Sequence, residues 1–210
     1  MHSGAQEDGK RTILAVTVAF VEHELHWRSF MEELLQRGLT GVRMITRDDH
    51  AGLRAARKAV FRGVPWQRCP FHLKQNVAPY VPKVEMRNGV TRDIRVILDA
   101  PEPTPAFELL RLTIAKVETS APKLAKWMES AIPEALTVIQ LPSEIRKRLR
   151  TTNGLERTNQ EIRRSFKTIG SFVTDASCLR LASAVIMEIS DEWQLGKAYI
   201  SIKEDKITAS

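Results

Sequence analysis

The stretch Arg150-Thr-Thr-Asn-Gly-Leu-Glu-Arg-Thr-Asn-Gln-Glu-Ile-Arg-Arg164 has the pattern of a helix that begins close to Asn153. Asn153 is a favourable N-cap, because its side-chain oxygen can accept a hydrogen bond from a free backbone N–H of the first turn. Four apolar residues follow at helical spacing and fall within one narrow stripe, which is predicted to be buried. They are Leu155, Ile162, Phe166 and Ile169.

Glu156 lies roughly 100° around this helix from Leu155. Four polar residues share its flank: Asn159, Gln160, Arg163 and Lys167. A carboxylate at the edge of the core, beside amides and cations, suits the joint binding of a metal ion and a phosphodiester. A structural interpretation stays open, because Asn153 and Glu156 also resemble a capping box and the cations could form a solvated face.

Positive charge is concentrated around this helix. The chain has 210 residues and a net charge of +7. Between Ser143 and Lys167 it has eight Lys or Arg residues against three Glu. This concentration favours a polyanionic partner, and nucleic acid is the first candidate. A merely soluble basic surface is the alternative.

Several classes of protein are disfavoured. Two cysteines, Cys69 and Cys178, are too few for a disulfide framework, so a reducing, cytoplasmic compartment is expected. The longest apolar run, Ile13–Val21, is too short for a membrane span, and Met1–Lys10 lacks a signal-peptide pattern. The chain contains no P-loop, no glycine-rich dinucleotide fingerprint and no Gly-x-Ser-x-Gly elbow.

The first 83 residues alternate between strand and helix patterns. Strands are predicted at Thr12–Val21, which should be buried, and at Val42–Thr46 and Val64–Cys69. Helices are predicted between them: one around Trp27 to Leu34 ended by Gly38, one carrying Leu53, Ala56 and Val60, and one at Phe71–Tyr80. This alternation indicates an α/β layer with at least partly parallel strands.

The pattern changes after Lys83. Val84–Thr91 is polar and turn-like, and residues 106–149 are helical, with Leu109, Leu112 and Val117 marking one helix. A second helix is marked by Leu124, Trp127, Met128 and Ile132. The predicted domains are an α/β core at 1–83, a mainly helical insertion at 84–149, C-terminal helices at 150–200 and a polar tail at 201–210. The last helix is predicted at Ser177–Tyr199, with a frayed end from Ile200.

Asp48 and Asp49 end the second predicted strand. In open α/β sheets, ligand-binding groups gather at the carboxyl ends of strands, where an Asp can hold a divalent metal through oxygen. The alternative is an N-cap for the helix that begins at Ala51. Asp48 stands 108 residues before Glu156. A fold that brings such carboxylates together could hold two metal ions for phosphodiester transfer.

The segment Cys69-Pro-Phe-His72 offers a thiol and an imidazole three residues apart. Two ligands do not complete a structural zinc site, and a Cys–His nucleophile pair has no third group nearby in the sequence. A buried structural Cys69 and a polar His72 near the strand ends are therefore favoured.

Three motifs together resemble the Mutator-type transposases of bacterial insertion sequences. They are Asp48-Asp-His-Ala-Gly-Leu53, Trp66-Gln-Arg-Cys-Pro-Phe-His72 with Asn76 after it, and the stretch from Arg150 to Arg164. Shorter flanking matches agree: His26-Trp27, Arg37-Gly-Leu39, Leu179-Arg-Leu181 and Trp193. The resemblance extends from about Thr12 to Tyr199.

The resemblance implies a ribonuclease H-like core whose Asp-Asp-Glu triad binds Mg²⁺ or Mn²⁺, with a helical insertion before the Glu. By motif position Asp48 is the second acid and Glu156 the third, and both are implied metal ligands. Cys69, His72 and Asn159 belong to motifs near the site. The implied phosphate contacts are Lys147, Arg148, Arg150, Arg157, Arg163, Arg164 and Lys167.

The implied activity is DNA cleavage and strand transfer, and its substrates are transposon ends and target DNA. The implied location is the nucleoid in the cytoplasm, and no membrane is involved. A homo-oligomer in a synaptic complex is the implied assembly. The chain departs from the family at Ser165, where a third Arg is usual, and at Val173, where a Pro is usual. The family's first Asp lies upstream of the matched region, and Asp8 does not fit its pattern. The chain is therefore expected to be an inactive C-terminal part of a transposase. A non-catalytic DNA-binding remnant that interacts with full-length transposase is the alternative.

Overall fold

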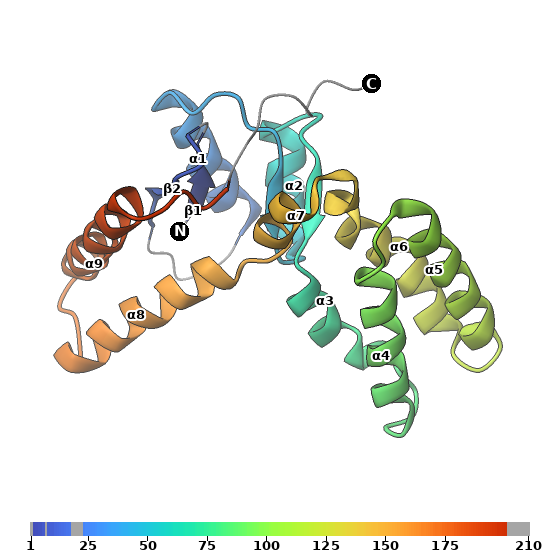
Figure 1. Ribbon diagram of the computed structural model, residues 1–210. Coiled ribbons are helices and arrows are strands. Elements are labelled where there is room, and N and C mark those ends of the chain that lie inside the picture. Colours follow the sequence, from blue (N-terminus) through green and yellow to red (C-terminus); the bar gives the residue numbers. More distant parts are fainter. Residues whose placement is uncertain (1, 7, 18–22, 201–210) are drawn as a thin grey trace. The chain divides into compact units, whose positions relative to one another are not determined.

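The computed structural model describes residues 2–6, 8–17 and 23–200. These residues form a mixed α/β structure in which helices predominate and the strands make two separate two-stranded sheets (Figure 1). The chain divides into two compact units. Unit 1 comprises Met1–Gly41, Ala51–Arg62 and Asn153–Ser210, and unit 2 comprises Val42–His50 and Gly63–Thr152. Each unit is therefore assembled from separate segments of the chain.

Unit 1 contains an antiparallel hairpin, β1 (His2–Ala5) and β2 (Arg11–Ala15). β1 was not predicted, because its short run of small and polar residues carries little strand propensity. The prediction of a buried strand over Thr12–Val21 was wrong in two respects. β2 ends at Ala15 and its residues are only half-buried, while residues 18–22 lie outside the described part of the chain.

Helices α1 (Glu24–Gln36) and α2 (Ala51–Val60) pack together in unit 1. The apolar residues predicted for α1 are buried, and so are Leu53 and Ala56 of α2, whereas Val60 is half-buried. α1 ends in a Schellman motif: Gly38 N–H bonds to Leu35 O and Leu39 N–H to Leu34 O, with Gly38 at φ +94°. The predicted glycine stop is confirmed.

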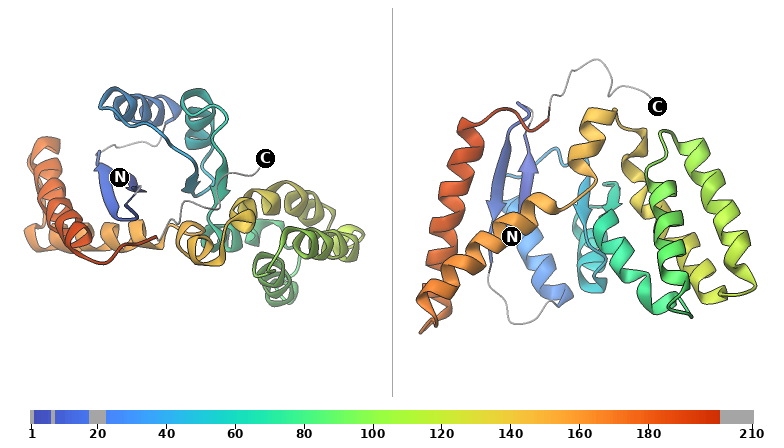
Figure 2. Two further views of the ribbon diagram at one scale, coloured as in Figure 1. Left: turned by 45° about the horizontal axis from the view of Figure 1, so that its top comes forward. Right: turned by 60° about the horizontal axis from the view of Figure 1, so that its bottom comes forward.

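Helices α8 (Asn153–Ile169) and α9 (Asp175–Leu195) complete unit 1, with α9 beside the hairpin (Figure 2). Buried Ile162, Ala182 and Ile186 form their shared core. The predicted α8 stripe was partly wrong, because Ile169 is 54% exposed and Thr158 is buried instead. α9 ends four residues earlier than predicted, and Ile200 is buried rather than frayed.

Unit 2 contains the parallel pair β3 (Ile45–Arg47) and β4 (Trp66–Arg68), in which Thr46 is aligned with Gln67. The prediction of parallel strands is confirmed here. α3 (Pro70–Asn76) and the 3₁₀ turn η1 (Ala78–Tyr80) follow β4, in place of one predicted helix. Two separate pairs of strands do not establish the larger sheet of a ribonuclease H-like core, so that part of the fold stays a prediction.

The rest of unit 2 is helical: α4 (Met86–Leu98), α5 (Pro103–Glu118), α6 (Pro122–Ala135), η2 (Thr137–Gln140) and α7 (Ser143–Leu149). The predicted turn at Val84–Thr91 was wrong, because α4 begins at Met86. Leu112 is also 51% exposed, and Ala106 and Leu110 of α5 are buried instead. None of the described helices is long and apolar enough to cross a membrane.

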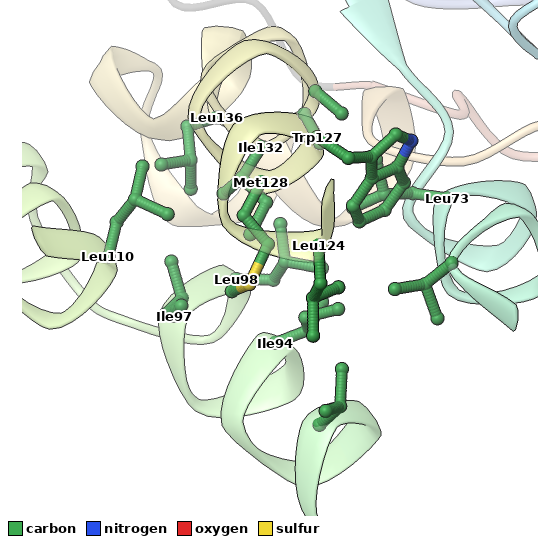
Figure 3. Close-up of a cluster of buried hydrophobic side chains, with 14 of the residues drawn as sticks. Leu73, Ile94, Ile97, Leu98, Leu110, Leu124, Trp127, Met128, Ile132 and Leu136 are labelled. Carbon is green, nitrogen blue, oxygen red and sulfur yellow. The ribbon is translucent and has the colours of Figure 1, made fainter. Parts of the chain in front are cut away.

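The main core of unit 2 lies between α3, α4, α5 and α6 (Figure 3). The four residues predicted to mark α6 are all buried in it: Leu124, Trp127, Met128 and Ile132. Of the helices in this core, α6 contacts β4.

Candidate catalytic site

The carboxyl ends of β3 and β4 meet at one edge, because the two strands are parallel neighbours. Asp48 directly follows β3 and Cys69 directly follows β4. The Cys69 N–H donates to the Arg47 carbonyl at 3.0 Å, so the ladder continues to the residue before Asp48. The prediction that Asp48 and the Cys69 motif lie at strand ends is confirmed.

Asp48 and Asp49 have different surroundings. Asp49 Oδ2 pairs with Arg68 Nη2 at 3.0 Å, and the Arg68 side chain is only 3% exposed. Asp48 Oδ1 instead accepts hydrogen bonds from Asp49 N at 2.7 Å and Asn76 Nδ2 at 3.4 Å. Among the described residues Asp48 has no ion-pair partner, and its side chain is half-buried. Asp48 is thus the carboxylate left available for a cation.

Buried polar groups fix the strand end that carries this site. Gln67 is fully buried; its Nε2 donates to the carbonyls of Arg68 and Ala135 at 2.8 Å, and its Oε1 accepts from Val138 N at 3.0 Å. Arg68 also lies 3.9 Å from the Glu134 carboxylate. Sequence reasoning missed both residues, although two polar residues within a strand were the available signal.

Cys69 is fully buried, and its Sγ accepts a hydrogen bond from Thr152 Oγ1 at 3.5 Å. His72 is half-buried on α3, with a ring nitrogen within 4.8 Å of the Cys69 Sγ. The predicted buried thiol is confirmed. This bond attaches Thr152, the last residue of unit 2, to the residue that follows β4.

Glu156 belongs to unit 1 and lies in the first turn of α8, where its side chain is half-buried. Asn153, the predicted N-cap, is the first residue of α8 itself. The residue that precedes the helix is Thr152. Asn159 lies one turn further on and is exposed. A carboxylate in the first turn is favoured by the positive end of the helix dipole, whatever its chemical role.

The predicted phosphate contacts fall into two groups. Arg157, Arg163, Arg164 and Lys167 of α8 are exposed and form no ion pair with a described residue. In unit 2, Lys147 and Arg148 are exposed. Arg150 differs, because its Nη2 bonds to the Asp99 carboxylate at 3.1 Å and the Leu98 carbonyl at 3.3 Å. Arg150 therefore has a structural role in unit 2.

Comparison with known proteins identifies the family of the chain. The family described as "Transposase, Mutator family" matches residues 1–196. The transposase for insertion sequence element IS406 of Burkholderia multivorans is 50% identical over 198 residues, which are 94% of this chain and 51% of that protein. The ISRM5 transposase of Rhizobium meliloti is 35% identical over 201 residues, 96% of this chain and 50% of the relative.

The IS1081 transposase of Mycobacterium tuberculosis is 31% identical over 201 residues, 96% of this chain and 48% of the relative. The chain thus spans about half the length of the curated relatives it matches. The matched region contains all three motifs of the site. The chain belongs to the Mutator family of transposases.

Proposed function

We propose that the chain is the part of an insertion-sequence transposase that supplies the second and third acids of an Asp-Asp-Glu site, Asp48 and Glu156. The observation that carries this proposal is the contrast at the end of β3. Arg68 forms an ion pair with Asp49, whereas Asp48 forms no ion pair with a described residue. The reaction is cleavage of DNA at the transposon ends and strand transfer into a target.

The residues fit a hard divalent cation. Asp48 and Glu156 offer carboxylate oxygens, which are the ligands that Mg²⁺ and Mn²⁺ prefer. When bound, such ions activate the attacking hydroxyl and stabilise the leaving oxygen of a phosphodiester. The Asn76 amide, which donates to Asp48 Oδ1, orients that carboxylate.

The basic residues of α8 bind the DNA backbone in this proposal. Their charges are exposed and not neutralised by described acids, so they are available to phosphates. Phosphate contacts of this kind give affinity without sequence choice and weaken as salt concentration rises.

The 210 residues on their own are proposed to lack cleavage activity, because none of the acids that the structure describes before β3 is assigned as the first acid. Asp8 is the only Asp before β2. It lies in the turn of the hairpin, where its Oδ1 accepts a hydrogen bond from Lys10 N at 2.8 Å. Metal-dependent cleavage of DNA by the isolated chain, lost in both Asp48→Asn and Glu156→Gln, would contradict this part of the proposal.

A chimera tests the assignment of the acids. The matching region of the IS406 transposase is replaced by this chain, and excision of an IS406 element is measured in cells. We expect the chimera to excise the element, and Asp48→Asn and Glu156→Gln each to reduce excision at least about 1,000-fold. Asp191→Asn on α9 and Glu161→Gln on α8 are matched controls, because both acids are exposed and their side chains form no hydrogen bond or ion pair with a described residue.

The alternative function is a non-catalytic DNA-binding remnant that interacts with full-length transposase. The exposed cations of α8 favour DNA binding under either proposal. The chimera separates them. A chimera that is folded and binds transposon ends in a salt-sensitive manner, but never excises, supports the remnant and excludes catalysis.

A further inference from the structure

The guanidinium of Arg11 stacks on residues of unit 1 that are distant in the sequence. We call this arrangement of Arg11 with Trp193 and Tyr199 the clasp. Its Cζ lies 3.3 Å from the centroid of the Trp193 ring and 4.8 Å from that of Tyr199. Arginine stacks on aromatic faces in this way because its planar, delocalised charge is attracted to the ring. Arg11 begins β2, and the two rings lie at the end of α9 and just after it.

Backbone contacts close the same clasp. Tyr199 N–H and Ile200 N–H both donate to the Gly9 carbonyl, at 2.8 and 3.0 Å. Gln194 Nε2 donates to the Arg11 carbonyl at 3.3 Å. Arg11 is thereby held from both sides, through its own backbone and through the aromatic rings.

The guanidinium also lies directly against the first turn of α8. A Cβ atom placed on Gly154 would lie 3.1 Å from Arg11 Cζ and closer still to Nη1. Only a residue without a side chain leaves room for the guanidinium there. Glu156 follows Gly154 by two residues in the same turn.

The position of the cation relative to the helix is specific. The N-terminal end of a helix carries partial positive charge, so its dipole alone does not attract a cation. The stacking on Trp193 and Tyr199 contributes to holding Arg11 there. The chain thus keeps a cation at the one turn of α8 that carries the candidate catalytic acid.

We propose that Arg11 is a positioning residue: clasped by Trp193 and Tyr199, it fixes the first turn of α8 through Gly154 and so sets the direction of the Glu156 carboxylate. This inference rests on the proposed function of Glu156. Arg11 itself acts through α8 and is not a catalytic residue.

Hydrogen exchange on the full 210-residue chain tests the clasp without any catalytic readout. The amides of Arg157–Gln160 report the first turn, because in an α-helix they bond to the carbonyls four residues earlier. We expect Arg11→Ala to speed their exchange at least about tenfold. Arg11→Lys should not restore protection, because an ammonium lacks the planar stacking surface. Lys197→Ala removes an exposed cation near the clasp and should change nothing.

Gly154→Ala gives the sharpest comparison. Alanine favours a helix more than glycine does, so intrinsic propensity predicts slower exchange in the first turn. Displacement of Arg11 by the new methyl group predicts faster exchange. Slower exchange in Gly154→Ala, or unchanged exchange in Arg11→Ala, overturns the clasp. Unchanged exchange in α6 shows that unit 2 remains folded in each variant.

The chimera tests the link to Glu156. In a cleavage assay on IS406 ends, Arg11→Ala should raise the Mn²⁺ concentration for half-maximal rate about tenfold, while the rate at saturating Mn²⁺ is largely retained. A loss of rate that is equal at all Mn²⁺ concentrations overturns the positioning role and leaves a structural one. If the unmutated chimera never cleaves, the proposed function fails, and the exchange experiment still decides whether Arg11 fixes the turn.

Discussion

Gln67 shows how a single buried polar residue determines the local geometry of the candidate site. Its side-chain amide forms three hydrogen bonds to backbone groups: one within β4, to Arg68 O, and two that join β4 to α6 and η2. The Thr137 hydroxyl also donates to the Trp66 carbonyl, at 2.5 Å. The strand that carries Cys69 is thus attached to the helical core of unit 2 by hydrogen bonds as well as by apolar packing.

Gln67→Ala should therefore destabilise unit 2 strongly. It leaves two carbonyls and one N–H without their side-chain partner in a buried position, so we expect a loss of roughly 2–4 kcal/mol. Urea unfolding followed by circular dichroism measures this change. Gln140→Ala, at an exposed position of η2, is the control and should stay within about 0.5 kcal/mol of the parent. Equal effects of the two variants would mean that the Gln67 bonds contribute little.

At the scale of the element, α8 carries both the candidate acid and a basic flank. Arg163 and Lys167 are four residues apart and lie on the same flank as Glu156. Arg157 and Arg164 lie further around the helix, by the same 100° arithmetic. DNA that reaches Glu156 should therefore contact Arg163 and Lys167 first.

Charge removal on this flank should weaken DNA binding. We expect Arg163→Gln and Lys167→Gln each to lower affinity several-fold and to reduce the slope of log affinity against log salt by about 0.9. Fluorescence anisotropy with labelled duplex DNA over a range of salt concentrations measures both quantities. Lys126→Gln on α6 makes the same charge change at another exposed position. If it has an equal effect, binding depends on net charge and not on α8.

The elements also show how far the sequence could be interpreted. α1 and α6 were predictable, because their apolar spacing was clear. The parallel direction of β3 and β4 was predictable from the alternation of strands and helices. α4 was not, because Asn88 and Gly89 weaken its first turns, and burial of Val90 and Ile94 outweighs that propensity. The choice of Asp48 over Asp49 rested on resemblance alone. A physical argument for the same choice comes from Arg68, whose pairing with Asp49 depends on the fold.

At the scale of the whole molecule, the two units differ in their cores. In the part of the chain that the structure describes, helices of unit 2 share one large apolar cluster, whereas the cluster between α8 and α9 of unit 1 has three buried residues, Ile162, Ala182 and Ile186. Asp48 belongs to unit 2 and Glu156 to unit 1. The predicted domains, namely core, insertion and C-terminal helices, follow the order of the sequence. They stay a prediction.

The unequal cores predict unequal stability. Because the free energy of local opening follows buried apolar contact, amides of α8 and α9 should exchange faster than those of α6, by about tenfold or more. Ile186→Ala should speed exchange in α8 and α9 and leave α6 unchanged, whereas Ile132→Ala should act on unit 2, at a cost of about 2–5 kcal/mol. Hydrogen exchange with mass spectrometry resolves both. If all three helices exchange at one rate and respond equally to either substitution, the units unfold as one cooperative structure, and the unequal cores do not set local stability.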